Sequence, residues 1–468
     1  MMSITHTSLN IDPVSEPVGA PDWRTIRRAF QRFTTLVDVV PTLRSCVPEL
    51  STGPFEVMDC AILDAKLKTY LKTTSKQKST LSACYQLTLR EGVTGSISQR
   101  ILYIKVFLGG QSREVLHQIT QNGLSDSDFC HAVLFVPEHD LILWRFPHDP
   151  SLPHLRHLVD LLAVEQYLPV EGLTQLGVGG RPQVLKRHLV NYRPEIRCTN
   201  RYTVYDATQD WTGELFGKTF GDAQGQALYE RLQFFWDRSL ADPEAMAIAR
   251  PLGYSPEINT LWQRGVSGTP LLQTLVPSNY KHYIAAVAKG LASLHTSNVP
   301  ILATHSPADH LVEIHKKLTK LSDAIPQLSD LFEDVANAIE QTAPHSSTIP
   351  FRPIHWDFHI DQLLANNGAI VFCDLDELVN GDPLQDLANF VVDLHFRRAD
   401  HELVVLITKE LCRQYRQLVD WPVSAERFAW HTRIQLVNKA YRHYLRFAPD
   451  FEETVEQIIR VAQRGFLP

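Results

Sequence analysis

HWDFHIDQLLANNGAIVFCDLDE, which runs from His355 to Glu377, is the stretch of sequence that decides the fold. Within it, Asn367 and Gly368 stand between two apolar runs, and Asn-Gly in that setting is the strongest short signal for a two-residue hairpin turn. With those two residues in the loop, the strand register makes Leu364 face Val371. The stretch therefore predicts a tight β-hairpin.

Polar side chains gather where this hairpin opens. The same register brings Gln362 beside Cys373 and Asp374, at the end away from the turn. The polar residues at this end and in the loop that approaches it are His355, Asp357, Asp361, Gln362, Asp374 and Asp376. Mg²⁺ prefers oxygen ligands and completes its shell with water and nucleotide phosphates. Taken alone, any one of these aspartates would be an ordinary solvated turn residue, but together the group predicts a Mg²⁺ site.

The composition of the whole chain is that of a globular protein with more than one domain. Its 468 residues exceed one ordinary core, and 44% are hydrophobic and 21% charged. A net charge of −7 gives no general electrostatic reason to bind nucleic acid or an anionic membrane. Any phosphate site must therefore be local, and the oligomeric state is not indicated.

Cysteine usage and apolar patterning favour a cytoplasmic protein. The seven cysteines are odd in number and form no CxxC pair, which argues against a disulfide framework and against a zinc site. No apolar run reaches the roughly 18 residues of a membrane-spanning helix. The N-terminus also lacks the basic-then-apolar order of a signal peptide. We expect reduced, mostly buried cysteines and no membrane association.

The pattern of the chain changes along its length. Residues 1–20 are rich in Ser, Thr and Pro without periodicity, and we expect a mobile tail there. Residues 21–170 predict an α+β module that includes a hairpin formed by ACYQLTL and ILYIKVF. A strand-rich segment at 171–265 precedes a mainly helical segment at 266–468. Because strands precede helices rather than alternate with them, the fold class is α+β.

One helix of the C-terminal half is predicted with its buried face. In KHYIAAVAKGLASLHTS the apolar residues recur at i, i+3, i+4 and i+7, which is the spacing of one buried stripe. These residues are Ile284, Val287, Ala288, Leu291 and Leu294. We expect this helix to be structural.

The motifs around the hairpin resemble those of the aminoglycoside phosphotransferase and choline kinase superfamily. They are His355-x-Asp357-x4-Gln362, Asp374 after an apolar strand, and GDPLQDLA from Gly381 to Ala388. The resemblance implies a protein-kinase-like fold of two lobes. Residues 171–265 would be the β-rich nucleotide-binding lobe, and residues 266–468 the helical catalytic and acceptor-binding lobe. It also implies ATP and Mg²⁺ as cofactors and transfer of the γ-phosphoryl group to a hydroxyl of a small molecule.

The same resemblance implies roles for individual residues. The family residue that matches Asp357 orients and deprotonates the acceptor hydroxyl, and the one that matches Asp374 binds Mg²⁺, with Asp376 assisting. The residue five places after the base is usually Asn, whereas this chain has Gln362, which keeps the carbonyl oxygen and adds one methylene. Gln is usual there in the maltokinase-like branch, which the sequence resembles most nearly. That branch favours a sugar or amino sugar as acceptor.

Further residues of the motif are expected to support the catalytic loop. Asp386 resembles the family residue that holds the loop from the following helix, and we expect His355 to brace the loop rather than to transfer protons. Trp356 replaces the Gly that is common after the His. His295 matches a recurrent Leu-His pair of the family, although a satisfied core histidine is the simpler interpretation on an apolar helical face.

A kinase of this kind needs a strand lysine for the nucleotide phosphates and an acidic helix residue that holds this lysine. Lys218 in ELFGKTF is followed by the helical AQGQALYERLQFFW, which offers Glu230 as its partner. Lys105 ends a similar strand, but it would require an unusually long insertion before Asp357. We therefore predict the pair Lys218–Glu230 and interpret Lys105 as a solvated lysine.

Two other nucleotide contacts are predicted in this lobe. The loop NYRPEIRC stands where a phosphate-covering loop is expected, so that Arg193 and Arg197 would meet the nucleotide. Gln263 follows Trp262 in a segment that resembles the family's hinge and would contact adenine. The loop contains neither GxGxxG nor GxxxxGK[ST], so a P-loop NTPase is not indicated.

Other functions are compatible with these motifs. The divergent RPEIRC loop, Gln362 and Trp356 leave room for a catalytically silent, kinase-like protein that binds nucleotide and regulates a partner. A kinase-like enzyme could also act on Ser or Thr of proteins, or transfer a nucleotidyl group. The sequence does not specify the acceptor, and the polar or aromatic candidates of the C-terminal half are Asp393, His395, Arg397, Arg398 and Trp430.

The N-terminal module, residues 21–170, resembles the extra module that some of these kinases carry before the nucleotide lobe. It contains the stretch FVPEHDLILWRFPHDPSLPHL, from Phe135 to Leu155. We expect this stretch to pack against the nucleotide lobe. Substrate gating and an interaction surface are the alternatives.

Overall fold

The computed structural model describes most of the chain. The described residues are 23–51, 53–68, 79–108, 110–121, 132–242, 244–301, 303–398, 400–448 and 450–465. The expected tail, residues 1–20, and Cys130 lie outside them. The other cysteines are free in this structure.

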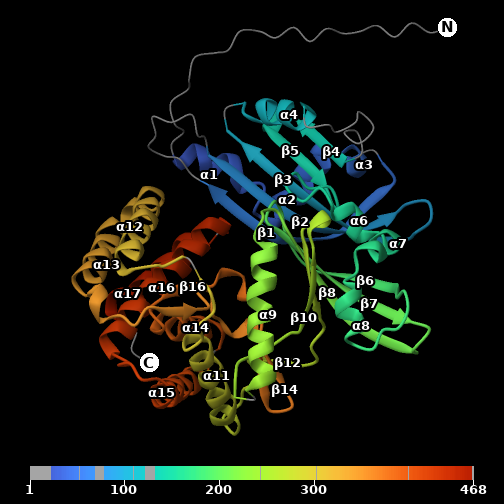
Figure 1. The fold of residues 1–468 in the computed structure, drawn as a ribbon. Helices are drawn as coiled ribbons and strands as arrows, with labels where there is room; N and C mark the ends of the chain where they lie inside the picture. Colours follow the sequence, from blue (N-terminus) through green and yellow to red (C-terminus); the bar gives the residue numbers. More distant parts are fainter. Residues whose placement is uncertain are drawn as a thin grey trace, which may run out of the picture.

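An antiparallel sheet forms the N-terminal part of the molecule (Figure 1). Within the described residues its strand order is β1-β2-β3-β5-β4. The strands are β1 (Phe55–Lys68), β2 (Thr80–Glu91), β3 (Ile97–Phe107), β4 (Val133–Val136) and β5 (Leu141–Arg145). The helices of this part are α1 (Trp23–Gln31), α2 (Leu36–Cys46), α3 (Pro48–Ser51) and α4 (Ser112–Gln121). The hairpin predicted from ACYQLTL and ILYIKVF is confirmed, because β2 pairs with β3 along its length.

A second antiparallel sheet follows, with the strand order β10-β11-β8-β7-β6 among the described residues. Its strands are β6 (Gln183–Arg193), β7 (Arg197–Asp206), β8 (Trp211–Phe220), β10 (Pro251–Ser255) and β11 (Thr260–Arg264). The helices that accompany it are α6 (Leu155–Val159), α7 (Leu161–Val164), α8 (Val170–Thr174) and α9 (Gly225–Ala241).

Residues alternate between the two faces of β7, as the pleat of a strand requires. Cys198 and Tyr202 are buried, and the Tyr202 hydroxyl donates to the carbonyl of Leu158 in α6 at 2.8 Å. Arg197 and Thr199 are on the opposite, partly exposed face. One face of this sheet therefore packs on the short helices, and the other is free to line a site.

The C-terminal part is helical, with short strands inserted (Figure 1). The helices are α10 (Leu271–Thr274), α11 (Tyr280–His295), α12 (Pro307–Ala324), α13 (Ser329–Gln341), α14 (Leu384–Arg397), α15 (His401–Leu418), α16 (Ala425–Arg446) and α17 (Phe451–Arg464). The strands are β9 (Ala247–Ile248), β12 (Thr269–Pro270), β13 (Arg352–Ile354), β14 (Leu363–Asn366), β15 (Ala369–Phe372) and β16 (Val379–Gly381). They form the small sheets β12-β14-β15-β9 and β13-β16.

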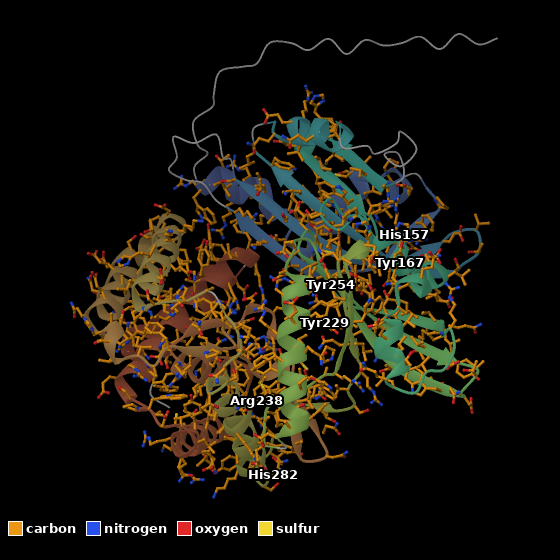
Figure 2. All side chains as sticks on the ribbon, viewed as in Figure 1. His157, Tyr167, Tyr229, Arg238, Tyr254 and His282 are labelled. Carbon is orange, nitrogen blue, oxygen red and sulfur yellow. The ribbon has the colours of Figure 1, made fainter. Side chains whose placement is uncertain are left out.

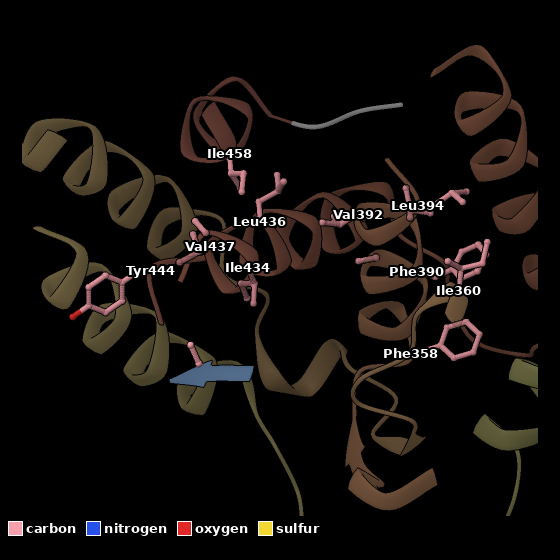
Figure 3. Close-up of a cluster of buried hydrophobic side chains, with 14 of the residues drawn as sticks. Phe358, Ile360, Phe390, Val392, Leu394, Ile434, Leu436, Val437, Tyr444 and Ile458 are labelled. Atoms are coloured by element: carbon pink, nitrogen blue, oxygen red, sulfur yellow. The ribbon is translucent and has the colours of Figure 1, made fainter. Parts of the chain in front are cut away.

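The core of this helical part also anchors the stretch from His355 to Glu377. Each residue of the predicted apolar stripe on α11 is buried, which confirms that prediction. Figure 3 shows Phe358 and Ile360 in the same apolar cluster as Phe390 of α14, and the Phe358 and Phe390 rings lie 5.5 Å apart. Phe358 and Ile360 of this loop enter the core, so the residues that alternate with them, Asp357 and His359, remain partly exposed.

Helix α1 joins the N-terminal part to the last helices of the chain. The Trp23 ring lies 5.8 Å from that of Tyr444 on α16, 5.6 Å from that of Phe447 and 6.0 Å from that of Phe451 on α17. Arg27 forms an ion pair with Glu452. The N-terminal part therefore contacts the helical part as well as the second sheet.

The architecture is α+β, with β-sheets in the N-terminal half and helices in the C-terminal half. None of the helices in the described part of the chain is both long enough and apolar enough to cross a membrane.

Candidate active site

The hairpin predicted from the sequence is present with its predicted register. β14 and β15 are antiparallel, and Leu364 is opposite Val371. Asn367 and Gly368 have φ angles of 48° and 83°, as both central positions of a type I′ turn require. His282 of α11, labelled in Figure 2, forms a 2.9 Å hydrogen bond with the Gly368 carbonyl. The Asn-Gly turn thus fixes the pairing, and α11 holds its tip.

The open end of the hairpin presents Asp374. The Cys373 amide donates to the Gln362 carbonyl at 2.9 Å, so these residues are adjacent as predicted. Asp374 has φ 59° and ψ 52°, a left-handed conformation that Asp adopts more readily than most other residues. This conformation turns the chain into the 3₁₀ turn Leu375–Glu377, which contains Asp376. Two carboxylates consequently leave the end of β15 close together.

Asp386 of α14 fixes the loop before the hairpin. It is fully buried and accepts from the amides of His355 at 2.6 Å and Trp356 at 3.0 Å. The same carboxylate lies 3.1 Å from Nε2 of His295, which is also fully buried. His355 in turn donates from Nε2 to the Cys373 carbonyl at 3.1 Å. The structure thus places Asp386 and His355 as bracing groups between the loop and the hairpin, and His295 as a bonded core histidine.

Trp356 has a backbone conformation that favours glycine. Its φ is 74°, in the left-handed region where a bulky side chain is strained by about 1–3 kcal/mol. Its ring lies 5.6 Å from that of His310 at an angle of 17°, and 4.4 Å from that of His305. The stacked rings and the hydrogen bond to Asp386 hold the strained residue.

Two cations from the second sheet meet the two carboxylates of the hairpin. Nζ of Lys218 is 2.5 Å from Asp374 and 2.7 Å from Asp376. The Arg197 guanidinium is 3.1 Å from Asp374 and 2.6 Å from Asp376. Side-chain exposure is 13% for Lys218 and 7% for Asp376, so this network is largely withdrawn from water. It joins the two lobes with charge-assisted hydrogen bonds.

The two carboxylates differ in their acidity. Burial opposes ionisation of Asp374, but Lys218 and Arg197 outweigh it and hold its pKa below the ordinary range. Burial raises the pKa of Asp376, and the nearby Asp374 charge adds to this effect against the two cations. The two cations therefore favour the ionised form of Asp374. Perturbed carboxyl groups of this kind are typical of functional sites.

The predicted pair Lys218–Glu230 is not formed, and this prediction needs correction. Glu230 is exposed on α9 and accepts from the Gln226 amide at 2.8 Å. Arg231, the next residue of this helix, is half-buried, and burial lowers its pKa although the charge of Asp376 opposes this shift. The carboxylate partners of Lys218 therefore come from the hairpin and not from α9.

A cleft of about 280 Å³ lies between the second sheet and the hairpin. Lys218, Arg197, Asp374 and Asp376 form its polar end. Its apolar lining includes Phe216, Leu232, Val266, Leu364 and Phe372. Gln263 of β11 also lines it, with its side-chain nitrogen 3.5 Å from the Ala249 carbonyl. An apolar slot that leads to a cluster of charges suits a molecule with a flat base at one end and phosphates at the other.

Asp357 is not among the residues that line this cleft. Its side chain is 38% exposed, with the Arg442 guanidinium at 3.5 Å and Nε2 of His359 at 3.8 Å. Burial raises the pKa of the nearby Glu377 carboxyl, and the charge of Asp357 raises it further. Asp357 is therefore accessible from solvent while its loop is fixed by the core.

Gln362 also lies outside the residues that line the cleft. It is 5% exposed, and its Oε1 accepts from the backbone amide of His359 at 3.2 Å. The side-chain oxygen that the sequence assigned to a metal thus closes a short turn of its own loop. The predicted meeting of Gln362, Asp374 and Asp357 at one cleft is wrong on this point, because only Asp374 reaches the cleft.

The donor set fits Mg²⁺ in type and number. Mg²⁺ is commonly held by one or two carboxylates together with substrate phosphates. Asp374 and Asp376 supply two carboxylates at the polar end of the cleft. Among the described residues, no group of three or more His, Cys, Asp and Glu side chains is arranged to hold a metal by itself. A metal at this place would accordingly need phosphate oxygens to complete its shell.

Comparison with known families identifies the chain. Residues 203–452, more than half of its length, match the phosphotransferase enzyme family, APH. The chain belongs to this family. Comparison with curated protein sequences gives no significant match. The match begins within β7 and ends in α17, so the APH part contains Lys218 and the whole hairpin, while the sheet β1–β5 lies before it.

Several solved structures resemble the chain in fold. A thermostable mutant of aminoglycoside phosphotransferase APH(4)-Ia is 16% identical with a TM-score of 0.46, and the alignment covers 64% of this chain and 98% of the other. A choline/ethanolamine kinase family protein from Mesorhizobium loti is 15% identical with a TM-score of 0.41, at 62% and 90% coverage. The amicoumacin kinase hAmiN is 10% identical with a TM-score of 0.44, at 62% and 92% coverage.

The acceptor candidates of the APH part are mostly engaged in structural contacts. Trp430 is fully buried and donates to the Ile339 carbonyl at 2.9 Å. Arg398 bonds the Leu272 and Leu275 carbonyls at 3.3 and 3.2 Å. The carboxylate of Asp393 lies 3.5 Å from Lys439 and 3.6 Å from Arg397. The charged residue nearest to Asp357 across the loop is instead Arg442 of α16, which carries no motif that sequence reasoning could recognise.

Proposed function

We propose that this member of the APH family transfers the γ-phosphoryl group of ATP to a hydroxyl of a small molecule, a sugar or an amino sugar. The network of Lys218 and Arg197 with Asp374 and Asp376 carries this proposal. Phosphoryl transfer depends mainly on positioning and on charge stabilisation, and this network places both signs of charge at the end of an apolar cleft.

The cleft would hold the nucleotide with its base in the apolar slot. Gln263 of β11 lines this cleft. Lys218 and Arg197 would then meet the phosphates, because they are the lining cations that pair with Asp374 and Asp376. Asp374 and Asp376 would hold Mg²⁺, which when bound neutralises charge on the phosphate oxygens.

Asp357 would act as the general base toward the acceptor hydroxyl. Phe358 and Ile360 anchor its loop in the core, and Asp386 fixes the backbone just before it. A carboxylate that is 38% exposed on such a rigid loop can receive a proton from a hydroxyl that approaches from solvent. His355 and Asp386 act only through this loop, so they are positioning residues.

Charges of both signs surround Asp357. Arg442 lies 3.5 Å from Asp357. Lys317 and Lys439 are paired with Glu313 and Asp393. The proposed acceptor, a sugar or an amino sugar, therefore rests on the resemblance of the motifs and not on the charges of this region.

The substitution Asp357→Asn tests the assignment of the base. Loss of a general base should lower the turnover number roughly 10²- to 10⁴-fold, while the affinity for Mg-ATP stays near that of the wild type because Asp357 does not line the nucleotide cleft. Turnover on a sugar acceptor and ATP affinity by calorimetry measure the two effects. Asp361→Asn, on the same loop, is the matched control, since Asp361 pairs with Arg397. Full activity of Asp357→Asn would refute the assignment.

One observation favours a second candidate, a silent nucleotide-binding regulator. Gln362 uses its side-chain oxygen within its own loop, so the usual metal ligand at this place is missing from the cleft. Such a protein would be stabilised by Mg-ATP without transferring phosphate to any hydroxyl compound. Measurement of thermal stability with Mg-ATP, alongside mass analysis of a panel of sugars and amino alcohols, separates the two candidates.

A further inference from the structure

The turn between β6 and β7, residues 193–197, is held by residues outside the second sheet. Nζ of Lys105 on β3 lies 2.9 Å from Oε1 and 3.2 Å from Oε2 of Glu195. Side-chain exposure is 22% for Lys105 and 27% for Glu195, so this bidentate pair is partly shielded from solvent. Lys105, which the sequence analysis interpreted as a solvated lysine, therefore has a defined partner on the turn.

A second contact holds the backbone of the same turn. Asp149, which is 8% exposed, accepts from the Glu195 amide at 2.9 Å and from the Tyr192 hydroxyl at 2.7 Å. The Phe146 ring lies 5.0 Å from the Tyr192 ring. The stretch FVPEHDLILWRFPHDPSLPHL therefore packs against the second sheet. Glu195 has φ 63°, and the two contacts together offset the strain of this left-handed conformation.

The turn that is held in this way determines where Arg197 lies. Arg197 is two residues beyond Glu195 and begins β7. The carbonyl of Ile196, between them, accepts from the Gly221 amide at 2.8 Å at the end of β8. A displacement of Glu195 would therefore move Arg197 relative to Asp374 and Asp376, with which it pairs across the cleft.

The N-terminal part is itself anchored on the helical lobe. Trp23 packs on the rings of Tyr444, Phe447 and Phe451, so α1 is fixed to α16 and α17. The Tyr85 hydroxyl of β2 donates to the Phe33 carbonyl at 2.7 Å, which ties the segment after α1 to the sheet that contains Lys105. The N-terminal part thus forms a continuous connection from the helical lobe to the turn above the nucleotide cleft.

We propose that the N-terminal part fixes the phosphate-covering turn, with Lys105 and Asp149 as positioning residues for Arg197 and hence for the bound nucleotide. This inference rests on the proposed function, because it assigns the phosphates to the polar end of the cleft. Neither Lys105 nor Asp149 lines the cleft. Their effect is exerted through Glu195 and the backbone of the turn.

A double-mutant cycle tests the proposal with Lys105→Met, Glu195→Gln and the double variant. Each single change should weaken the affinity for Mg-ATP roughly 3- to 10-fold, which is between the value of an exposed ion pair and that of a buried charged hydrogen bond. The double variant should be no worse than either single variant. The turnover number at saturating ATP should change less than twofold. Calorimetry without any acceptor gives the affinity, so the result does not depend on knowing the substrate.

Two controls separate positioning from a loss of fold. Lys186→Met removes an exposed lysine from β6 and should leave the affinity for Mg-ATP unchanged. The exchanged pair Lys105→Glu with Glu195→Lys should recover most of the lost affinity, which a general loss of stability would not allow. Hydrogen exchange of the Glu195 amide should accelerate in Asp149→Asn and also in Lys105→Met, while the melting temperature of Lys105→Met stays close to that of the wild type.

The outcomes distinguish this inference from the proposed function. Equal affinities across the cycle, additive losses, or an equal loss in Lys186→Met would overturn the positioning role and leave the phosphotransferase proposal intact. A wild-type protein that does not bind Mg-ATP would overturn both. Unchanged exchange at Glu195 in Lys105→Met and in Asp149→Asn would by itself show that the N-terminal part does not hold the turn.

Discussion

The two large sheets of this protein are built alike and use their lysines differently. In each, a long antiparallel hairpin ends in a strand that contains one half-buried lysine, Lys105 on β3 and Lys218 on β8. Lys105 meets one carboxylate, Glu195, on a turn of the neighbouring sheet. Lys218 meets the carboxylates Asp374 and Asp376, which leave the hairpin of the other lobe. The proposed roles of the two lysines therefore differ because of what their partners can bind, and not because of the strands that contain them.

The partners explain why only one of these lysines faces a binding site. The carboxylates opposite Lys218 line a cleft with an apolar extension, and they are the kind of ligand that a divalent cation takes. Glu195 is a single carboxylate on a turn, and its backbone amide is already bonded to Asp149. The carboxylates and cations around Lys218 can accept a charged ligand between them. Lys105 and Glu195 already satisfy each other and form no such site.

Lys218→Met is the most severe test of the difference between the two lysines. The substitution removes the ammonium group and retains much of the length of the side chain, so we expect kcat/KM for transfer to fall roughly 10²- to 10³-fold, as for other groups that stabilise transition-state charge. Mg-ATP affinity should fall as well. Steady-state rates and calorimetry measure both, with Lys105→Met as the comparison, where the loss should be confined to affinity. Equal losses in the two variants would contradict the distinction.

Arg197→Met sharpens the comparison, because Arg197 belongs to both regions. It begins the strand after the turn that Lys105 holds, and it pairs with the carboxylates that Lys218 meets. A hydrogen bond to a charged group contributes about 1.5–3 kcal/mol, so we expect a decrease in Mg-ATP affinity of roughly 10- to 100-fold. In this background Lys105→Met should have little further effect when affinity is measured again. A full additional loss would mean that Lys105 acts through another group.

Glu230→Gln should have the smallest effect. Glu230 is exposed and bonded to Gln226 on its own helix, so activity and Mg-ATP affinity should change less than twofold. Initial rates at low ATP concentration are the most sensitive measurement. A loss as large as that of Lys218→Met would show that α9 rotates to form the pair Lys218–Glu230 during the reaction.

The local part of the site could be predicted because short-range rules determine it. The Asn367–Gly368 turn fixes a period-two register, so the opposition of Leu364 and Val371 follows directly from the sequence. The contact of Asp386 with the loop was predicted from the motif GDPLQDLA. The stripe on α11 followed from helical spacing.

The parts that were missed depend on contacts between distant segments. On α9 the buried residues Leu228, Leu232 and Phe235 define one face, and Glu230, two residues from Leu228, points away from it. This periodicity could have excluded Glu230. The pairs of Lys105 with Glu195 and of Arg197 with Asp374 join segments 90 and 177 residues apart, and no local spacing reports such contacts. The sequence analysis assigned the Gln362 side chain to the metal, whereas its Oε1 accepts from the backbone amide of His359. The position of that amide depends on the backbone conformation, which the motif does not specify.

Transfer of phosphate from Mg-ATP to a panel of neutral sugars, followed by mass spectrometry of the sugars, tests the central claim most directly. The account predicts that the wild-type protein adds one phosphate to at least one sugar, that Asp357→Asn loses this transfer while it still binds Mg-ATP, and that Lys218→Met loses both transfer and affinity. Binding of Mg-ATP by the wild-type protein without transfer to any hydroxyl compound, or undiminished transfer by Asp357→Asn, would contradict it.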